Sequence, residues 1–252
     1  MKKFRIIMDM PVIIEVVDPQ VTEKIFEEVF NYFIYIDNTF SPFKKDSELT
    51  KINQGRLQKN EWSQDMKTVF KLCEQTSAET LGYFNIEKNR QFDPLGLVKG
   101  WAINNAANIL KTKGFKNYYV EAGGDIQVNG KNKENKLWRI GIQNPFNLKQ
   151  NVKIVTLSNQ GIATSGTYLR GQHIRNPFAP KKEISDIISL TVIGPNIYEA
   201  DRFATAAFAM GKKSITFIEN LKGFAGYIID NKGMATFTSN FSNFVFKNDK
   251  PN

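Results

Sequence analysis

The sequence predicts an α+β fold in which mixed, largely antiparallel sheets are flanked by helices. Strand-like and helix-like segments follow one another irregularly, without the repeated βα order of a doubly wound parallel sheet. The chain has 252 residues, of which 41% are hydrophobic and 23% charged, which is enough for one substantial core. The sequence contains no internal repeat or low-complexity linker. We therefore expect a single domain that covers residues 1–252.

The first third of the chain is predicted to hold one strand and three helices. Residues 4–17 build up to an apolar run that is typical of a strand and that Asp18-Pro19 ends. Ser, Thr and Gly residues at the segment ends supply the expected caps and stops. The expected helices run from Thr22 to about Asn38, in a short segment after the loop at residues 40–49, and from Ser63 to Leu81 before Gly82.

The remainder is predicted to consist of short strands around two long helices. Gly114 and Gly211 follow the helical segments and are expected to end them. The turn residues Asn231-Lys232-Gly233 favour a hairpin near the end of the sequence. The expected helices cover residues 98–113 and about 198–210, and the expected strands cover residues 118–121, 126–128, 138–142, 154–157, 161–164, 187–192, 226–229 and 235–238.

The charge balance and the cysteine content narrow the classes of function. The formal net charge of +9 favours anionic partners such as nucleotides or nucleic acid, or serves solubility alone. Cys73 is the only cysteine, which excludes an internal disulfide, and its apolar helical context predicts burial. The sequence has no apolar run long enough for a membrane span and no signal-peptide pattern. We therefore expect a cytoplasmic protein.

Asp201 and Thr205 form a pair four residues apart in a predicted helix. This spacing places a carboxylate and a hydroxyl on one face, and both are oxygen ligands of the kind that Mg²⁺ prefers. The same pattern also suits an Asp near a helix N-terminus, stabilised by the helix dipole, with the Thr packed inward. The spacing alone leaves both interpretations open.

A second candidate segment runs from Asp93 to Lys99 and precedes a helix. Gly96 permits close approach of a ligand to the backbone, and Lys99 is suited to a phosphate or a carboxylate. Simple helix initiation, with Pro94 in the first turn and Lys99 in solvent, explains the same residues. Further along, Gly123-Gly124 follows an apolar strand and suits either a turn with positive φ or a phosphate-binding loop.

His173 is the only histidine of the chain and follows the hydroxyl-rich segment 164–168. A single histidine is more often structural than catalytic. Its place after a loop of small hydroxyl residues also suits proton transfer or ligand binding.

Taken in order, these segments resemble the ApbE family of FAD:protein FMN transferases. The resemblance extends from about residue 5 to residue 240 and depends on several short motifs that occur in the same order. The motifs are Met8, Ser47-Glu48-Leu49 with Asn53, Phe92-Asp93-Pro94 with Lys99-Gly100-Trp101-Ala102, Ala122-Gly123-Gly124-Asp125-Ile126, Ala163-Thr164-Ser165-Gly166, His173-Ile174 with Pro177, and Ala200-Asp201 with Ala204-Thr205-Ala206.

The resemblance implies that FAD is bound in a central cleft and that Mg²⁺ bridges its diphosphate. It implies that Asp201 and Thr205 hold the ion, with the backbone carbonyl of Gly96 as a third ligand. The positions implied for contact with FAD are Met8, Phe43, Tyr83, Phe84, Asn85, Asp93, Lys99, His173 and Ile174. Met8 and Phe43 are implied to contact the flavin or adenine rings, and residues 83–85 match an adenosine-binding segment.

The resemblance also implies a reaction. A Ser or Thr hydroxyl of an acceptor protein attacks the FMN phosphorus of FAD, AMP leaves, and FMN remains attached through a phosphoester. Asp201 and His173 are the candidate catalytic residues, His173 for proton transfer. The sequence identifies neither the acceptor protein nor the oligomeric state.

The chain departs from the family pattern at Met8-Asp9-Met10, where the family usually has Met-Gly-Thr, and at Asn85, where it commonly has Asp. These departures keep two alternatives open, a Mg²⁺-dependent FAD pyrophosphatase and an FAD-binding protein without catalysis. A nucleic-acid binder would explain the charge but not the ordered motifs, and we expect no nucleic-acid partner.

Overall fold

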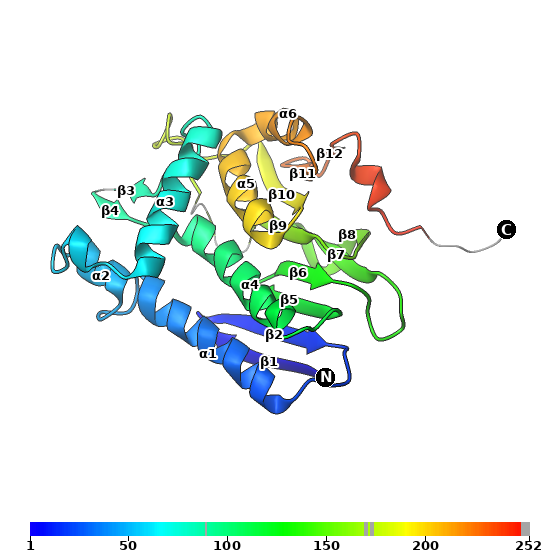
Figure 1. Ribbon diagram of the computed structural model, residues 1–252. Coiled ribbons are helices and arrows are strands. Elements are labelled where there is room, and N and C mark those ends of the chain that lie inside the picture. The colour runs from blue at the N-terminus through cyan, green and yellow to red at the C-terminus, as the bar shows by residue number, and fades with distance from the viewer. Residues whose placement is uncertain (89, 169–170, 172–173, 248–252) are drawn as a thin grey trace.

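The computed structural model describes residues 1–88, 90–168, 171 and 174–247. Its centre is an eight-stranded antiparallel sheet with the order β1-β2-β5-β6-β9-β10-β11-β12 (Figure 1). These strands are β1 (Lys2–Ile7), β2 (Met10–Val16), β5 (Tyr118–Ala122), β6 (Asp125–Asn129), β9 (Gly161–Gly166), β10 (Ile187–Gly194), β11 (Ala225–Asp230) and β12 (Ala235–Phe237). Two hairpins lie outside this sheet: β3 (Glu87–Lys88) with β4 (Gln91–Phe92), and β7 (Trp138–Asn144) with β8 (Asn147–Leu157). The predicted α+β class with largely antiparallel sheets is confirmed.

Helices cover one face of the large sheet and follow the order of its strands (Figure 1). From one edge of the sheet to the other, α1 contacts β1, α4 contacts β5, α5 contacts β9 and β10, and α6 contacts β11. The helices are α1 (Glu23–Phe40), α2 (Glu48–Asn53), α3 (Gln64–Glu79), α4 (Leu95–Thr112), α5 (Ile197–Ala209) and α6 (Ser214–Glu219), with short 3₁₀ turns at Lys59–Glu61, Gly211–Lys213 and Phe241–Asn243. The packing of α4 against α5 brings the candidate site residues together.

Side chains on the two faces of the sheet enter two separate apolar cores. On β11, Ile228 belongs to the core under the helices, whereas Tyr227 and Ile229 belong to a smaller core under the β7–β8 hairpin. This alternation follows from the period of two along a strand. Because β7–β8 covers part of the second face, the later strands of the sheet are apolar on both sides.

Several local predictions can be compared with the structure. The helix expected from Ser63 is α3, and Ser63 is its N-cap, accepting a hydrogen bond from the Met66 N–H at 3.1 Å. Thr22 occupies the N-cap of α1, but its side chain makes no capping hydrogen bond. Residues 4–17 were expected to form one strand, and this prediction is wrong: β1 and β2 form a hairpin that turns at Met8 and Asp9.

The reason for this error lies in the turn chemistry. Met8 and Asp9 both adopt left-handed backbone conformations, with φ of 57° and 55°. Such conformations usually require Gly or Asn, and Met gives no sequence signal for them. The structure also has helix α6 and the small β3–β4 hairpin, neither of which was predicted, and α4 begins at Leu95 rather than at Val98.

Within the described part of the chain, none of the helices has both the length and the apolar character needed to cross a bilayer.

Candidate functional site

The predicted metal ligands meet where α4 and α5 cross. The Thr205 hydroxyl donates to the backbone carbonyl of Gly96 at 3.1 Å, and the Gly100 N–H donates to Asp201 Oδ2 at 2.7 Å. These two backbone groups belong to residues four apart in α4, so they lie within one helical turn of each other. Here each of these two groups is contacted by a side chain of α5. The three residues assigned to the metal by resemblance, Gly96, Asp201 and Thr205, are therefore neighbours in space.

Glycine is necessary for this close approach of the two helices. A Cβ atom at Gly100 would lie 2.6 Å from the Asp201 Cβ and 2.9 Å from the carbonyl oxygen of Ile197. At Gly96 it would lie 2.8 Å from the Thr205 Cγ2. Both glycines have their main effect on helix packing, because they let the side chains of α5 reach the α4 backbone.

A buried cluster of charged groups surrounds Asp201. The Lys99 ammonium lies 2.6 Å from Asp125 Oδ2 and 4.0 Å from Asp201 Oδ1. Asp125 and Asp201 are 1% and 3% exposed, and the other oxygen of Asp125 accepts the Thr164 N–H at 3.0 Å. The interpretation of Lys99 as a solvated residue is thus wrong, since its ammonium pairs with a buried carboxylate.

Burial raises the pKa of Asp201 to about 7. Lys99 and the Gly100 N–H oppose this rise, while the neighbouring Asp125 adds to it through charge repulsion and a hydrogen bond between the two carboxyl groups. One ammonium therefore compensates two carboxyl groups, and only one carboxylate charge is fully neutralised. This arrangement has a surplus of negative charge when both acids are ionised, which is a condition that favours a bound cation.

The residues present fit a magnesium ion. Magnesium takes oxygen ligands and commonly needs only one or two protein carboxylates beside phosphate oxygens and water. The contact between α4 and α5 offers a carboxylate from Asp201, a hydroxyl from Thr205 and a carbonyl from Gly96, all oxygen donors. The 3.1 Å separation of Thr205 Oγ1 and the Gly96 carbonyl oxygen supports the fit, because two oxygens bound to one ion lie about this far apart.

Two N–H groups at the N-terminus of α5 are already bound by protein side chains. Gln127 Oε1 accepts the Ile197 N–H at 2.8 Å, and Asn196 Oδ1 accepts the Glu199 N–H at 2.9 Å. A free helix N-terminus is a common site for phosphate, and here part of that capacity is used internally.

The segment before α4 is held by Asn53 of α2. The Asn53 side chain donates to the Phe92 carbonyl at 2.9 Å and accepts the Phe92 N–H at 2.7 Å. This clamp fixes the chain directly before Asp93, whose exposed carboxylate accepts the Leu95 N–H at 3.3 Å. Asp93 lies directly before the N-cap residue Pro94 and accepts the first N–H of α4, which agrees with helix initiation, and its exposed position also leaves it accessible to a ligand.

The positions linked to nucleotide contact by resemblance differ in exposure. Phe43 is 87% exposed, whereas Phe84 is buried beside Gly96. Tyr83 is half-buried and makes an edge contact with the exposed Phe178, with ring centroids 5.0 Å apart. Asn85 is exposed, and its Oδ1 accepts the Glu87 N–H at 2.7 Å.

The remaining predicted contacts are Met8 and Ile174, which are both partly buried against the main core. His173, the candidate for proton transfer, lies outside the described residues. Gly123 and Gly124 have φ of 58° and 92°, so the interpretation of this segment as a turn is confirmed. Cys73 is buried as predicted, and burial raises the pKa of its thiol to about 12.

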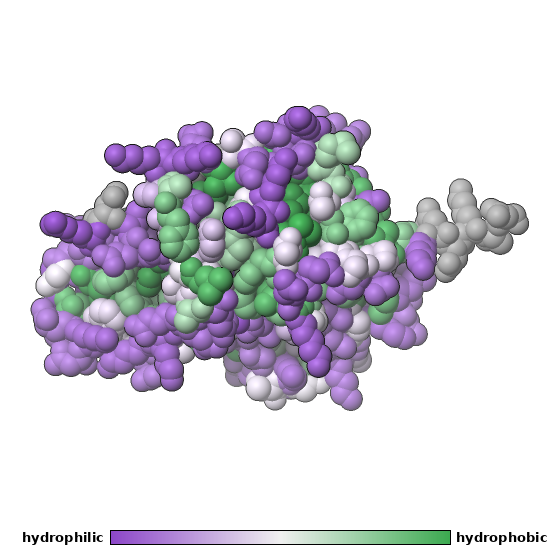
Figure 2. Space-filling view, turned by 90° about the horizontal axis from the view of Figure 1, so that it is seen from above, coloured by the Kyte–Doolittle hydropathy of each residue, from purple (hydrophilic) through white to green (hydrophobic). Residues whose placement is uncertain are grey.

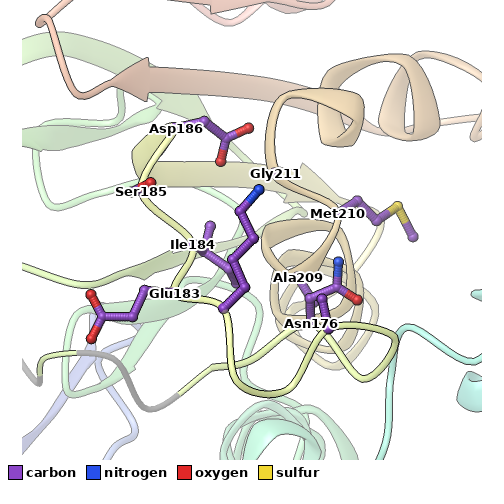
Figure 3. A pocket seen from close by; sticks show the side chains of 10 residues that line it. Asn176, Glu183, Ile184, Ser185, Asp186, Ala209, Met210 and Gly211 are labelled. Atoms are coloured by element: carbon purple, nitrogen blue, oxygen red, sulfur yellow. The ribbon is translucent and has the colours of Figure 1, made fainter.

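A pocket of about 220 Å³ lies at the C-terminal end of α5. Figure 3 shows Glu183, Ile184, Ser185 and Asp186 on one side of it, and Asn176 beside Ala209 and Met210 at the end of α5 on the other. Thr205 and Ala209 are four residues apart on α5, so this pocket begins one turn beyond the Thr205 hydroxyl.

Seen from above, apolar side chains gather over the middle of the molecular face and hydrophilic ones border them (Figure 2).

Fold and site together define an α+β domain in which a helix–helix contact presents oxygen ligands beside a buried charge cluster. The ApbE family model matches residues 8–90 and 87–228. The chain belongs to the ApbE family, and the resemblance inferred from the sequence motifs is confirmed.

Similar curated proteins carry the name FAD:protein FMN transferase. The Klebsiella pneumoniae protein is 31% identical over 144 residues, which are 54% of this chain and 41% of that protein. The Vibrio cholerae protein is 32% identical over 126 residues, which are 46% of this chain and 38% of that protein. The matched region thus spans about two fifths of the length of these relatives.

Solved structures share the fold over nearly the whole chain. The ApbE protein of Thermotoga maritima has a TM-score of 0.85 at 22% identity, covering 98% of this chain and 99% of that one. The flavin transferase ApbE of Vibrio cholerae has a TM-score of 0.83 at 22% identity, covering 97% and 99%. These similarities establish the fold.

The sequence did not single out Asp125 as a site residue, although the structure places it within the charge cluster. Tyr168 was missed as well: it lies close enough for Asp125 and Lys99 to affect its pKa, which burial raises. A signal for Asp125 does exist, because an acidic residue stands at the head of the apolar strand 126–128, where a buried partner is expected.

Proposed function

We propose that this chain is an FAD:protein FMN transferase that uses Mg²⁺. It would transfer the FMN moiety of FAD to a Ser or Thr hydroxyl of a partner protein and release AMP. Family membership and the name of the similar curated proteins support the class of reaction. The observation that carries the proposal is the convergence of Asp201, Thr205 and the Gly96 carbonyl where α4 meets α5.

In the proposed reaction, the acceptor oxygen forms a bond to the FMN phosphorus while the bond from that phosphorus to the bridging oxygen of AMP breaks. The hydroxyl proton passes to a base. Bound Mg²⁺ would supply charge neutralisation on the diphosphate, which is the main requirement of phosphoryl transfer. Asp201, Thr205 and Gly96 would hold the ion, and Lys99 lies close enough to add positive charge.

The other predicted site residues would bind and orient FAD. His173 is the candidate for accepting the proton. The exposed Phe43 ring and the Tyr83–Phe178 pair are suited to stacking against flat rings. The residues assigned to FAD contact are Met8, Phe43, Tyr83, Phe84, Asn85, Asp93, Lys99, His173 and Ile174.

Incubation with FAD, Mg²⁺ and an acceptor peptide tests the proposal. The peptide should carry an Asp-x-x-Ser/Thr-Gly-Ala-Thr-like motif, with a Ser/Thr→Ala peptide as its matched control. We expect a fluorescent peptide whose mass has increased by the FMN group, together with an equal amount of AMP. The Ala peptide should remain unlabelled, and EDTA should abolish both products.

Other outcomes would identify other functions. Release of FMN and AMP at the same rate with and without the acceptor would identify a Mg²⁺-dependent FAD pyrophosphatase. Tight FAD binding with neither labelled peptide nor AMP, across several acceptor sequences, would contradict both enzymatic functions and leave a flavin-binding protein.

A further inference from the structure

We infer that Asp125 is a positioning residue that holds the Lys99 ammonium away from Asp201 and so keeps an Asp201 oxygen available to a divalent cation. This inference rests on the proposed function, because it concerns the cation site of that function. It adds a role for a residue that neither binds the ion nor takes part in the transfer.

The distances show which carboxylate holds Lys99. Its ammonium is 2.6 Å from Asp125 Oδ2, a short charge-assisted contact, but 4.0 Å from Asp201 Oδ1, which is at the limit for an ion pair. The other oxygen of Asp201 accepts the Gly100 N–H. When both acids are ionised, the hydrogen bond between the two carboxyl groups is absent, and Oδ1 is then the oxygen of Asp201 that is available to an ion. Oδ1 is also the Asp201 oxygen that lies 4.0 Å from the Lys99 ammonium.

Asp125 is fixed in place independently of Lys99. Its Oδ1 accepts the Thr164 N–H from the neighbouring β9, and its side chain is almost fully buried. The positive-φ turn at Gly123 and Gly124 places it at the first position of β6. A rigid carboxylate of this kind can anchor a flexible lysine chain, which has several rotatable bonds.

Loss of the Asp125 charge removes the closer of two carboxylates that pair with the Lys99 ammonium, at 2.6 Å against 4.0 Å. Among the described residues, Asp201 is the other carboxylate that forms an ion pair with Lys99. An ammonium moved onto Asp201 Oδ1 would occupy the place of a cation ligand and would repel a divalent ion. Asparagine at position 125 keeps the oxygen that accepts the Thr164 N–H, so Asp125→Asn removes the charge with little change to the turn.

The test is a titration of the 252-residue chain with Mn²⁺, in which electron paramagnetic resonance measures free and bound Mn²⁺. In a second titration, added Mg²⁺ competes with Mn²⁺ for the site. Four proteins are compared: wild type, Asp125→Asn, Asp125→Asn with Lys99→Met, and Asp186→Asn. Asp186 is a control carboxylate that accepts the Lys212 N–H at 2.9 Å beyond the end of α5. Thermal unfolding in EDTA verifies that each variant is folded.

We expect Asp125→Asn to weaken Mn²⁺ binding by about tenfold or more, since an ammonium then competes for the same oxygen. Adding Lys99→Met should restore the affinity to near the wild-type value, and Asp186→Asn should leave it unchanged. Restoration by a second substitution is a result that a merely structural role of Asp125 does not produce.

Two results would overturn the inference alone. One is wild-type Mn²⁺ affinity in a folded Asp125→Asn protein, and the other is a double variant that binds no better than Asp125→Asn. Absence of Mn²⁺ binding by the wild-type protein would instead refute the proposed cation site, and this inference with it.

Discussion

Replacement of Gly100 by Ala tests the helix contact on which the candidate site depends. The new methyl carbon would lie 2.6 Å from the Asp201 Cβ, 2.9 Å from the Ile197 carbonyl oxygen and 3.0 Å from Asp201 Oδ2. Ordinary contacts are about 3.5–4 Å. One of these atoms belongs to the backbone, so α4 and α5 must move apart, and the 2.7 Å bond from the Gly100 N–H to Asp201 must lengthen.

The expected loss of stability follows from three contributions. Overpacking costs about 1–3 kcal/mol, and weakening a bond to a buried carboxylate costs about 1.5–3 kcal/mol. Ala gains about 1 kcal/mol over Gly in a helix interior. The net cost is about 1.5–5 kcal/mol, which for a chain of this size lowers the Tm by about 3–20 °C.

Circular dichroism during heating measures this loss, with Asn108→Ala as the matched control. Asn108 is exposed on the same helix, so its replacement reports helix propensity without the steric clash. We expect Asn108→Ala to unfold within a few degrees of the wild type. A Gly100→Ala protein as stable as this control would refute the reasoning about the α4–α5 contact.

Three further predictions concern individual side chains. Because burial raises the pKa of Asp201 to about 7, the folded protein in EDTA binds a proton there that the unfolded chain releases above about pH 4. The free energy of unfolding should therefore fall as pH rises from about 4 to 7, by up to about 1.4 kcal/mol per pH unit, and Asp201→Asn should remove this slope. The same pH dependence of urea unfolding in the wild type and in Asp201→Asn would contradict the prediction. Thr205→Val should lower Mg²⁺-dependent AMP release by about tenfold or more and should lower the free energy of unfolding by about 1 kcal/mol. Thr205→Ser keeps the hydroxyl and should retain activity. Equal activity of the two variants would exclude the hydroxyl as a ligand. Arg202 is 4% exposed, and its side chain contacts Glu79 and Glu199, each at 2.5 Å. Arg202→Met should lower the free energy of urea unfolding by about 1–3 kcal/mol, because both carboxylates lose a charged hydrogen-bond donor. Arg202→Lys should not restore this stability, because a single ammonium cannot span both carboxylates, and wild-type stability of Arg202→Lys would contradict this role.

The helices and most strands could be predicted because their signals are local. Ser63 caps α3 and Gly114 follows α4, as their residue types indicate. The β1–β2 turn could not be predicted, because Met8 and Asp9 are held at positive φ by the hairpin that they connect rather than by their own preferences. A prediction from composition and spacing fails where the surrounding structure imposes a rare backbone conformation.

The part of the candidate site that depends on local spacing was also predictable. The spacing of Asp201 and Thr205 placed both side chains on one face of α5, and the structure confirms that each contacts α4. The spacing could not show what faces them, because the contact between two helices is set by tertiary packing. The link from Lys99 to Asp125 likewise joins a helix to a distant strand, and no local pattern pairs them.

The two glycines of α4 explain why the site lies at this contact. Gly96 and Gly100 are four residues apart, as are Asp201 and Thr205, and because the helices run in opposite directions Gly96 meets Thr205 while Gly100 meets Asp201. Each glycine costs about 1 kcal/mol of helix stability relative to Ala. In return, the backbone of α4 becomes accessible, so that the Gly96 carbonyl accepts from Thr205 and the Gly100 N–H donates to Asp201. Alanine at both positions would push α5 away from α4, so that the carbonyl at position 96, although still present, would no longer meet the Thr205 hydroxyl as the proposed cation site requires.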